Sequence, residues 1–97
     1  MLDPSLIEGF EFDLGNLPHL LNRHLEPADV WDVFYSDPVF AEDLTQGSGD
    51  WYMIARVPGG YLTIVLTEAN SGDPRIARPV TGWPSGPGEI EAYERNS

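Results

Sequence analysis

The chain has 97 residues, and its 16 acidic side chains outnumber the 5 basic ones, which gives a formal net charge of -11. This charge argues against a general nucleic-acid-binding protein and against docking on an anionic membrane. A hydrophobic share of 41% excludes an acidic disordered chain, and the lack of cysteine excludes disulfides and thiolate metal sites. The length predicts one compact domain over residues 1–97. With no membrane-length apolar run and no signal peptide, the sequence predicts a cytoplasmic protein.

The first predicted element is a short strand at 10–13, where apolar and acidic residues alternate. A helix follows the N-cap residue Asn16. One face of this helix carries four residues at helical spacing: Leu17, Leu20, Leu21 and His24. A second helix starts at 26–27, and Pro38 ends it, because the residue before a proline avoids helical backbone.

The remainder of the chain predicts a β meander and a last helix. The predicted strands lie at 39–41, 51–57, 61–67 and 75–80, with a hairpin turn at 58–60, a turn at 70–74 and polar loops at 45–50 and 83–88. The last helix starts after Gly86. Because the connections are short, the strands should be antiparallel. The predicted fold is therefore α+β, a central antiparallel sheet of four to five strands with two N-terminal helices on one face and a short C-terminal helix.

His24 is the first functional candidate, because it is a titratable side chain on an otherwise apolar helix face. It is either packed at the helix C-terminus or acts, beside Arg23, as a general acid, a general base or a phosphate contact. Arg75 and Arg78 are the second candidates, predicted to lie three apart in one strand and to point to opposite faces. Two roles are open for their guanidinium groups: salt bridges with the abundant acidic side chains, or the binding of a phosphate.

The tryptophans and the acids complete the candidates. Trp31 and Trp51 are expected to be core or interface anchors, and Trp83, in a loop rich in proline and glycine, suits a partner anchor. Two interpretations are open for one group of acidic residues: they form a solvated surface, or they cluster in space and bind Mg²⁺. The group is Asp13, Asp37, Glu42, Asp43 and Asp50. The chain lacks a phosphate-binding loop, a zinc motif and a nucleophile elbow, so we expect no cofactor and no metal.

Several short motifs, in order over residues 10–95, resemble the BrnT toxin family of bacterial type II toxin–antitoxin systems. The motifs are the segments 10–13, 22–24, 26–30, 33–34, 37–38, 61–67, 75–78 and 91–94. The resemblance implies a RelE-like fold and a metal-independent ribonuclease that stops translation. In such an enzyme a ribose 2′-hydroxyl attacks the adjacent phosphate. The resemblance implies His24 as the acid or base and Arg78 and Arg75 as phosphate contacts, with Tyr93 nearby.

The resemblance also implies partners. They are an RNA substrate and a basic, DNA-binding ribbon-helix-helix antitoxin, with the toxin as a homodimer or in a heterotetramer with the antitoxin. Trp83, Arg23 and Trp51 are the residues that we expect at the partner interface. The alternative is a non-catalytic protein on the same scaffold, whose acidic surface binds a basic partner protein.

Overall fold

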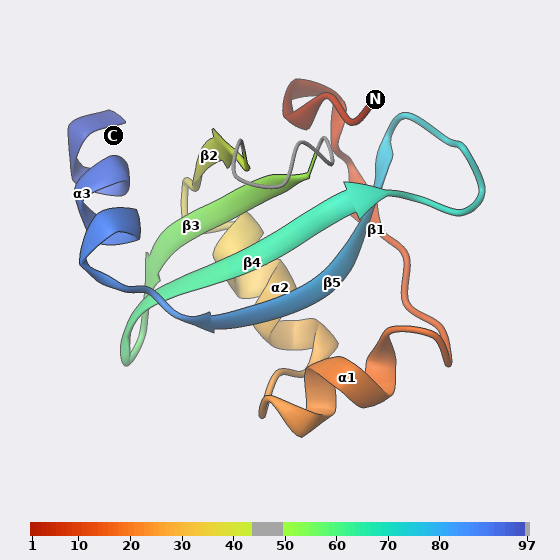
Figure 1. Ribbon diagram of the computed structural model, residues 1–97, viewed down its shortest axis with the longest axis horizontal. Helices are drawn as coiled ribbons and strands as arrows, with labels where there is room; N and C mark the ends of the chain where they lie inside the picture. The colour runs from red at the N-terminus through yellow and green to blue at the C-terminus, as the bar shows by residue number, and fades with distance from the viewer. Residues whose placement is uncertain (44–49, 97) are drawn as a thin grey trace.

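The computed structural model describes residues 1–43 and 50–96, and these residues fold around one five-stranded sheet in the order β1-β5-β4-β3-β2 (Figure 1). The strands are β1 (Gly9–Phe10), β2 (Val39–Glu42), β3 (Trp51–Val57), β4 (Gly60–Glu68) and β5 (Ile76–Pro84). The helices are the 3₁₀ turn η1 (Pro4–Leu6), α1 (Leu17–Asn22), α2 (Pro27–Phe34) and α3 (Pro87–Asn96). The predicted α+β class and layout are confirmed. Apart from Asp50, the polar loop predicted at 45–50 lies outside the described residues.

Strands β2 to β5 form the predicted antiparallel meander. The turn between β3 and β4 depends on glycine, because Gly59 has a φ of 99° and Gly60 a φ of 132°, where side chains are disfavoured. Strand β1 differs from the prediction: it is two residues long, and it pairs in parallel with β5. Strand β1 ends at Phe10, although the Glu11 N–H still donates to the Ala77 carbonyl at 2.9 Å, and the side chains of Glu11 and Asp13 contact Arg78 on β5.

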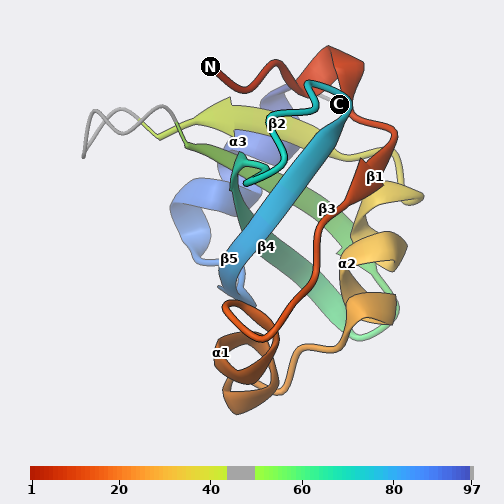
Figure 2. The same ribbon diagram turned by 90° about the vertical axis from the view of Figure 1, so that its right-hand side faces the viewer.

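Helices cover the two faces of the sheet unequally. Figures 1 and 2 show α2 behind one face with α1 beside it, whereas α3 lies on the other side. The core lies between the sheet and the N-terminal helices. It is built from alternate residues of the strands and from the inner sides of α1 and α2: Leu20, Leu25, Val30, Val33, Met53, Ala55, Ile64 and Leu66. The alternation predicted for 51–57 and 61–67 therefore sets which side chains enter this core, whereas Ile54, Thr63 and Val65 are buried on the opposite face.

Strand β5 is longer than predicted and contains Trp83, which pairs with Thr63 on β4. The prediction that a loop begins at residue 83 is therefore wrong, because β5 continues to Pro84. A Cβ added to Gly82 would lie 2.8 Å from the Thr63 carbonyl oxygen and 2.8 Å from a methyl of Ile64, so glycine permits the close approach of β4 and β5. A β-bulge between Val65 and Leu66 accommodates the proline-containing stretch opposite it.

Candidate functional site

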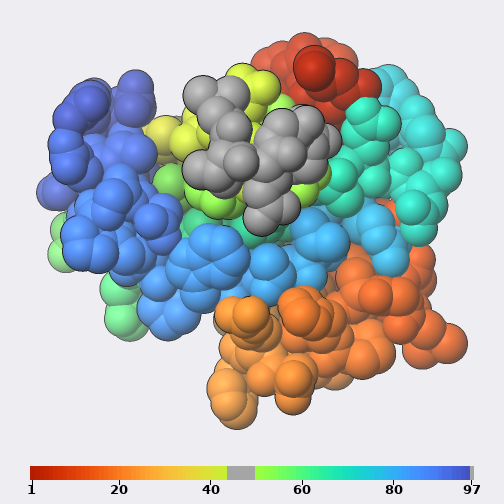
Figure 3. All heavy atoms as spheres, in the orientation of Figure 1, coloured from red at the N-terminus to blue at the C-terminus, as the bar shows by residue number. Residues whose placement is uncertain are grey.

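A pocket of about 430 Å³ opens between the end of α1, the start of α2 and the turn that joins β3 to β4. Figure 3 shows the surface hollowed between the orange α1 segment and the green β3–β4 turn. Its polar and aromatic lining comes from four elements or their ends: Arg23, His24, Asp29, Tyr61 and Trp83. Three of the predicted site residues, Arg23, His24 and Trp83, thus meet in one pocket.

His24 lies just past α1 and not on its apolar face, which corrects the predicted helix. The helix ends in a Schellman motif: the His24 N–H donates to the Leu21 carbonyl at 2.9 Å, and the Leu25 N–H donates to the Leu20 carbonyl at 2.9 Å. This motif requires a left-handed residue, and His24 has a φ of 61°. The exposed imidazole is therefore presented at the pocket edge by a backbone conformation that usually belongs to glycine.

The first turn of α2 supplies the acidic side of the pocket. Pro27 starts the helix, and the Asp29 carboxylate accepts the Glu26 N–H at 2.8 Å, which fixes the carboxylate beside the pocket. The helix ends at Phe34, four residues before the proline predicted to end it. Sequence reasoning missed Asp29 as a site residue, although its spacing from Glu26 is that of a capping pair.

Trp83 is held in place by α3 and by β3. Its ring meets Tyr52 edge-on, with centroids 5.9 Å apart, and its Nε1–H donates to Glu89 Oε1 at 2.8 Å. The same oxygen accepts the Gly86 N–H at 3.0 Å, so Glu89 joins the start of α3 to the indole. These hydrogen bonds, chiefly that from Trp83, lower the pKa of Glu89. The indole is partly buried and oriented, not a free loop side chain.

Tyr61 also lines the pocket. The sequence predicts that it lies in a strand, but no motif marks it as a functional residue. Its ring meets Tyr93 of α3 edge-on, with centroids 5.6 Å apart. Tyr93, a predicted site residue, therefore stands behind the pocket lining and is not part of it.

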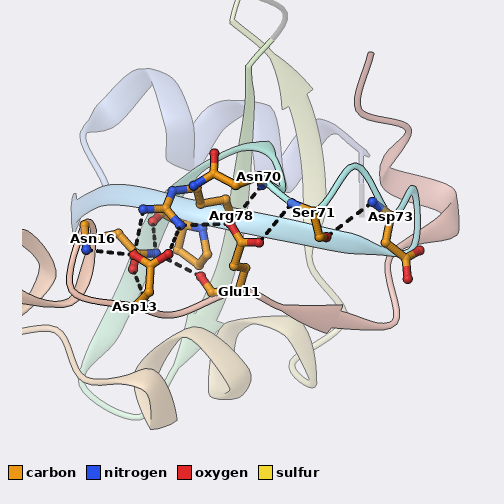
Figure 4. Close-up of polar contacts among 9 residues, drawn as sticks. Glu11, Asp13, Asn16, Asn70, Ser71, Asp73 and Arg78 are labelled. Atoms are coloured by element: carbon orange, nitrogen blue, oxygen red, sulfur yellow. Dashed lines mark hydrogen bonds and ion pairs between the residues drawn. The ribbon is translucent and has the colours of Figure 1, made fainter.

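Arg78 lies apart from the pocket, in a cluster that joins β5 to the segment after β1 (Figure 4). Its Nη1 donates to Glu11 Oε1 and to Asp13 Oδ2, both at 2.8 Å, and its side chain is only 12% exposed. The guanidinium, together with the Gly15 N–H, lowers the pKa of Asp13 to about 2. The two carboxylates in turn raise the pKa of Arg78.

Two further contacts complete this cluster. Glu11 also accepts the Asn70 N–H at 2.9 Å, which is the main reason that its pKa is lowered, and so it holds the turn between β4 and β5. Asn16, the predicted N-cap of α1, is buried, and its amide donates to the carbonyls of Glu11 at 2.9 Å and Pro79 at 2.8 Å. The cluster therefore fixes where α1 begins.

Arg75 precedes β5 rather than lying in it, and it too is outside the pocket. Its Nη2 lies 3.2 Å from Asp73 Oδ2, and its Nε lies 3.7 Å from Glu8. The hydrogen bond to Asp73 is the chief cause of the raised pKa of Arg75. In contrast, Arg23 and Arg56 have no ion pair with any residue in 1–43 or 50–96.

Trp51 and the predicted acid group lie elsewhere. Trp51 begins β3 opposite Glu42, packs partly buried against the core, and borders a shallow depression with Phe40. Asp43 and Asp50 are joined through the backbone, from the Asp43 N–H to the Asp50 carbonyl at 2.9 Å. Over residues 1–43 and 50–96, no three His, Asp or Glu side chains are grouped so that they could hold a metal ion.

In the described part of the chain, the helices are too short or too polar to cross a membrane. No protein-family model, curated protein or solved structure matches this chain. Function is therefore inferred from the pocket and from the surface chemistry.

Proposed function

We propose that this protein is a toxin of the BrnT kind, and that it cleaves RNA in the pocket at the end of α1 without a metal ion. The observation that carries the proposal is the convergence of His24, Arg23 and Trp83 on one pocket of about 430 Å³. A proton acceptor, a cation and an aromatic residue are the groups that cleavage of a single-stranded RNA needs.

The chemistry assigned to each group follows from its side chain. The His24 imidazole takes the proton of a ribose 2′-hydroxyl, whose oxygen then attacks the adjacent phosphorus and expels the 5′-oxygen of the next nucleotide. The products are a 2′,3′-cyclic phosphate and a free 5′-hydroxyl, whose oxygen takes up a proton from water. The Arg23 guanidinium stabilises the additional negative charge on the phosphate oxygens. Tyr61 and Trp83 also line the pocket, so the neighbouring bases would pack beside them.

The distribution of arginine supports this choice of cation. Arg75 and Arg78 are held by carboxylates, and so is Arg95, which pairs with Glu91. Arg23 lines the pocket, and Arg56 lies opposite Tyr61 in the register of β3 and β4. The phosphate contact that the resemblance implies for Arg78 and Arg75 is therefore assigned to Arg23 in this proposal.

The wider role is part of the same proposal. The toxin would act in the cytoplasm on RNA needed for translation, and a basic ribbon-helix-helix antitoxin would neutralise it. The net charge of -11 favours a basic partner, because opposite charges accelerate association.

Expression in a bacterial host tests the proposal. The wild-type chain should arrest growth, and His24→Gly and Arg23→Gln should not. Arg75→Gln is the matched control, because it also removes one arginine charge but outside the pocket. Growth arrest by His24→Gly and Arg23→Gln as strong as that by the wild type would contradict the proposal.

A second candidate function is a non-catalytic protein that binds a basic partner. One observation favours it: among the described residues, three of the five arginines are neutralised by carboxylates, which leaves a strongly acidic surface. This candidate predicts that the His24→Gly and Arg23→Gln variants keep the effect of the wild type in the growth experiment.

A further inference from the structure

The outer side of α2 carries a cluster of aromatic rings that the pocket does not use. Trp31 and Tyr35 are stacked, with centroids 5.5 Å apart and planes at 21°. Phe10 of β1 meets Trp31 edge-on at 4.9 Å and Phe34 at 5.3 Å. Figure 2 shows β1 and α2 side by side on the side of the molecule opposite α3. The four rings, three from β1 and α2 and one from Tyr35 just past α2, therefore form one connected cluster, in which Phe10 and Phe34 also pack against the core.

Tyr35 is the exposed member of this cluster. It is 76% exposed, whereas Val30 and Val33 on the inner side of the same helix are fully buried. Because Trp31 covers one face of the Tyr35 ring, this exposure leaves the other face open to solvent. An aromatic face carries negative charge density and attracts cations.

Two exposed aspartates lie close to Tyr35 in the sequence. Asp32 lies three residues before Tyr35, so the two side chains are neighbours on the helix surface, and Asp37 lies two residues beyond it. Both aspartates are exposed, and neither carboxylate has a hydrogen bond or an ion pair with a residue in 1–43 or 50–96. We call these six residues the aromatic–acidic surface: Phe10, Trp31, Asp32, Phe34, Tyr35 and Asp37.

We propose that the aromatic–acidic surface binds an arginine side chain presented by an extended segment of a basic partner protein. A guanidinium is planar, so it stacks on the open face of Tyr35 while its N–H groups donate to the Asp32 carboxylate. A lysine ammonium is a compact charge that cannot make both contacts in this way. The pairing of open ring and free carboxylate therefore selects arginine.

The neighbouring edge of the sheet favours a protein segment over a single amino acid. Strand β1 is the last strand of the sheet in the order β1-β5-β4-β3-β2, so no described strand lies on its outer side. Phe10 in this strand belongs to the aromatic–acidic surface. An extended segment can add hydrogen bonds along such an edge while its side chains reach the adjacent rings.

This inference rests on the second candidate function. The test distinguishes two negative outcomes: a basic partner that binds elsewhere on the protein, and no binding of a basic partner at all. The probe is a synthetic peptide of alternating arginine and valine, with matched peptides in which lysine or citrulline replaces arginine. Binding to the ¹⁵N-labelled chain is followed by amide chemical shifts at physiological salt. Asp32→Asn is compared with Glu94→Gln, which removes the same charge from an exposed position of α3. Tyr35→Ala is compared with Tyr35→Phe, which keeps the ring.

The expected result is a set of shifts confined to residues 8–10 and 31–37, with affinity falling from arginine to lysine to citrulline. Asp32→Asn and Tyr35→Ala should each weaken binding by roughly three- to fivefold or more, and Glu94→Gln and Tyr35→Phe by less than about twofold. Equal weakening by Asp32→Asn and Glu94→Gln would contradict specific binding at the aromatic–acidic surface. It would still agree with general electrostatic binding of basic partners. No binding of the arginine peptide would overturn both.

Discussion

The guanidinium of Arg78 donates to both oxygens of the Asp13 carboxylate, from Nη1 to Oδ2 at 2.8 Å and from Nη2 to Oδ1 at 2.9 Å. The two residues are 65 positions apart in the sequence. Their contact, together with that from Nη1 to Glu11, ties the segment before α1 to β5. Since α1 ends at Asn22, just before Arg23 and His24, this ion pair positions the pocket without lining it.

Replacing Arg78 by methionine should lower the free energy of unfolding at pH 7, because Asp13 and Glu11 lose their shared cation. The loss should shrink between about pH 4 and pH 2. The pKa of Asp13 is lowered from 3.8 to about 2 in the folded chain, so its contribution is fully present above pH 3.8 and disappears as pH falls through about 2. Urea unfolding of both proteins at pH 7, 4 and 3 measures the effect. An equal loss at pH 7 and pH 3 would contradict the ion-pair account.

His24→Gly should raise the free energy of unfolding by about 1 kcal/mol, because glycine adopts the left-handed conformation without steric cost. The φ of 61° at this position is the reason. His24→Val, which brings a β-branched side chain to the same conformation, should lower stability. Thermal unfolding compares the three proteins. A wild type more stable than His24→Gly would show that the imidazole contributes to packing.

Gly82→Ala should destabilise the fold by about 1–3 kcal/mol, as overpacking does. Its Cβ would lie 2.8 Å from the Thr63 carbonyl oxygen, which belongs to the sheet backbone and cannot turn aside. Gly88→Ala is the control: nothing lies within 4 Å of its Cβ position, and α3 should gain up to about 1 kcal/mol. In denaturant titrations, the unfolding midpoints of the two variants should therefore shift in opposite directions from the midpoint of the wild type.

Glu89→Ala should cost about 1–2 kcal/mol, because the Trp83 indole and the Gly86 N–H both lose their acceptor. Glu89→Gln keeps an oxygen at the same place and should cost less. Glu94→Ala, at an exposed position of the same helix, should change stability by less than about 0.5 kcal/mol. Similar losses for Glu89→Ala and Glu94→Ala in chemical denaturation would argue against Glu89 as the link between α3 and Trp83.

Local signals in the sequence predict much of the fold. The pairs Glu26–Pro27 and Gly86–Pro87 mark helix starts because capping and proline placement act within a few residues. Alternation in β3 and β4 predicts which side chains enter the core under α1 and α2, because strand side chains have a period of two, but it does not predict that the opposite face is buried as well. The short parallel β1 was not predictable from local patterns, since the strand it pairs with, β5, is far along the chain.

The candidate site was predictable only in part. Arg23 and His24 are adjacent in the sequence, so the sequence alone predicts that both belong to the same site. Trp83 was singled out as a loop residue, yet its place in β5 follows from the close packing at Gly82, which is a property of the whole sheet. Tyr61 joins the pocket because the β3–β4 turn faces the end of α1, and no local pattern contains that relationship.

The most direct test of the pocket measures cleavage of a single-stranded RNA by the purified protein with a metal chelator present. The wild-type protein should cleave the RNA and leave a 2′,3′-cyclic phosphate, and His24→Gly should cleave it at least about a hundredfold more slowly. Because this variant should be at least as stable as the wild type, unfolding would not explain the loss. Cleavage by His24→Gly at the wild-type rate, or an intact RNA after incubation with the wild-type protein, would contradict the account.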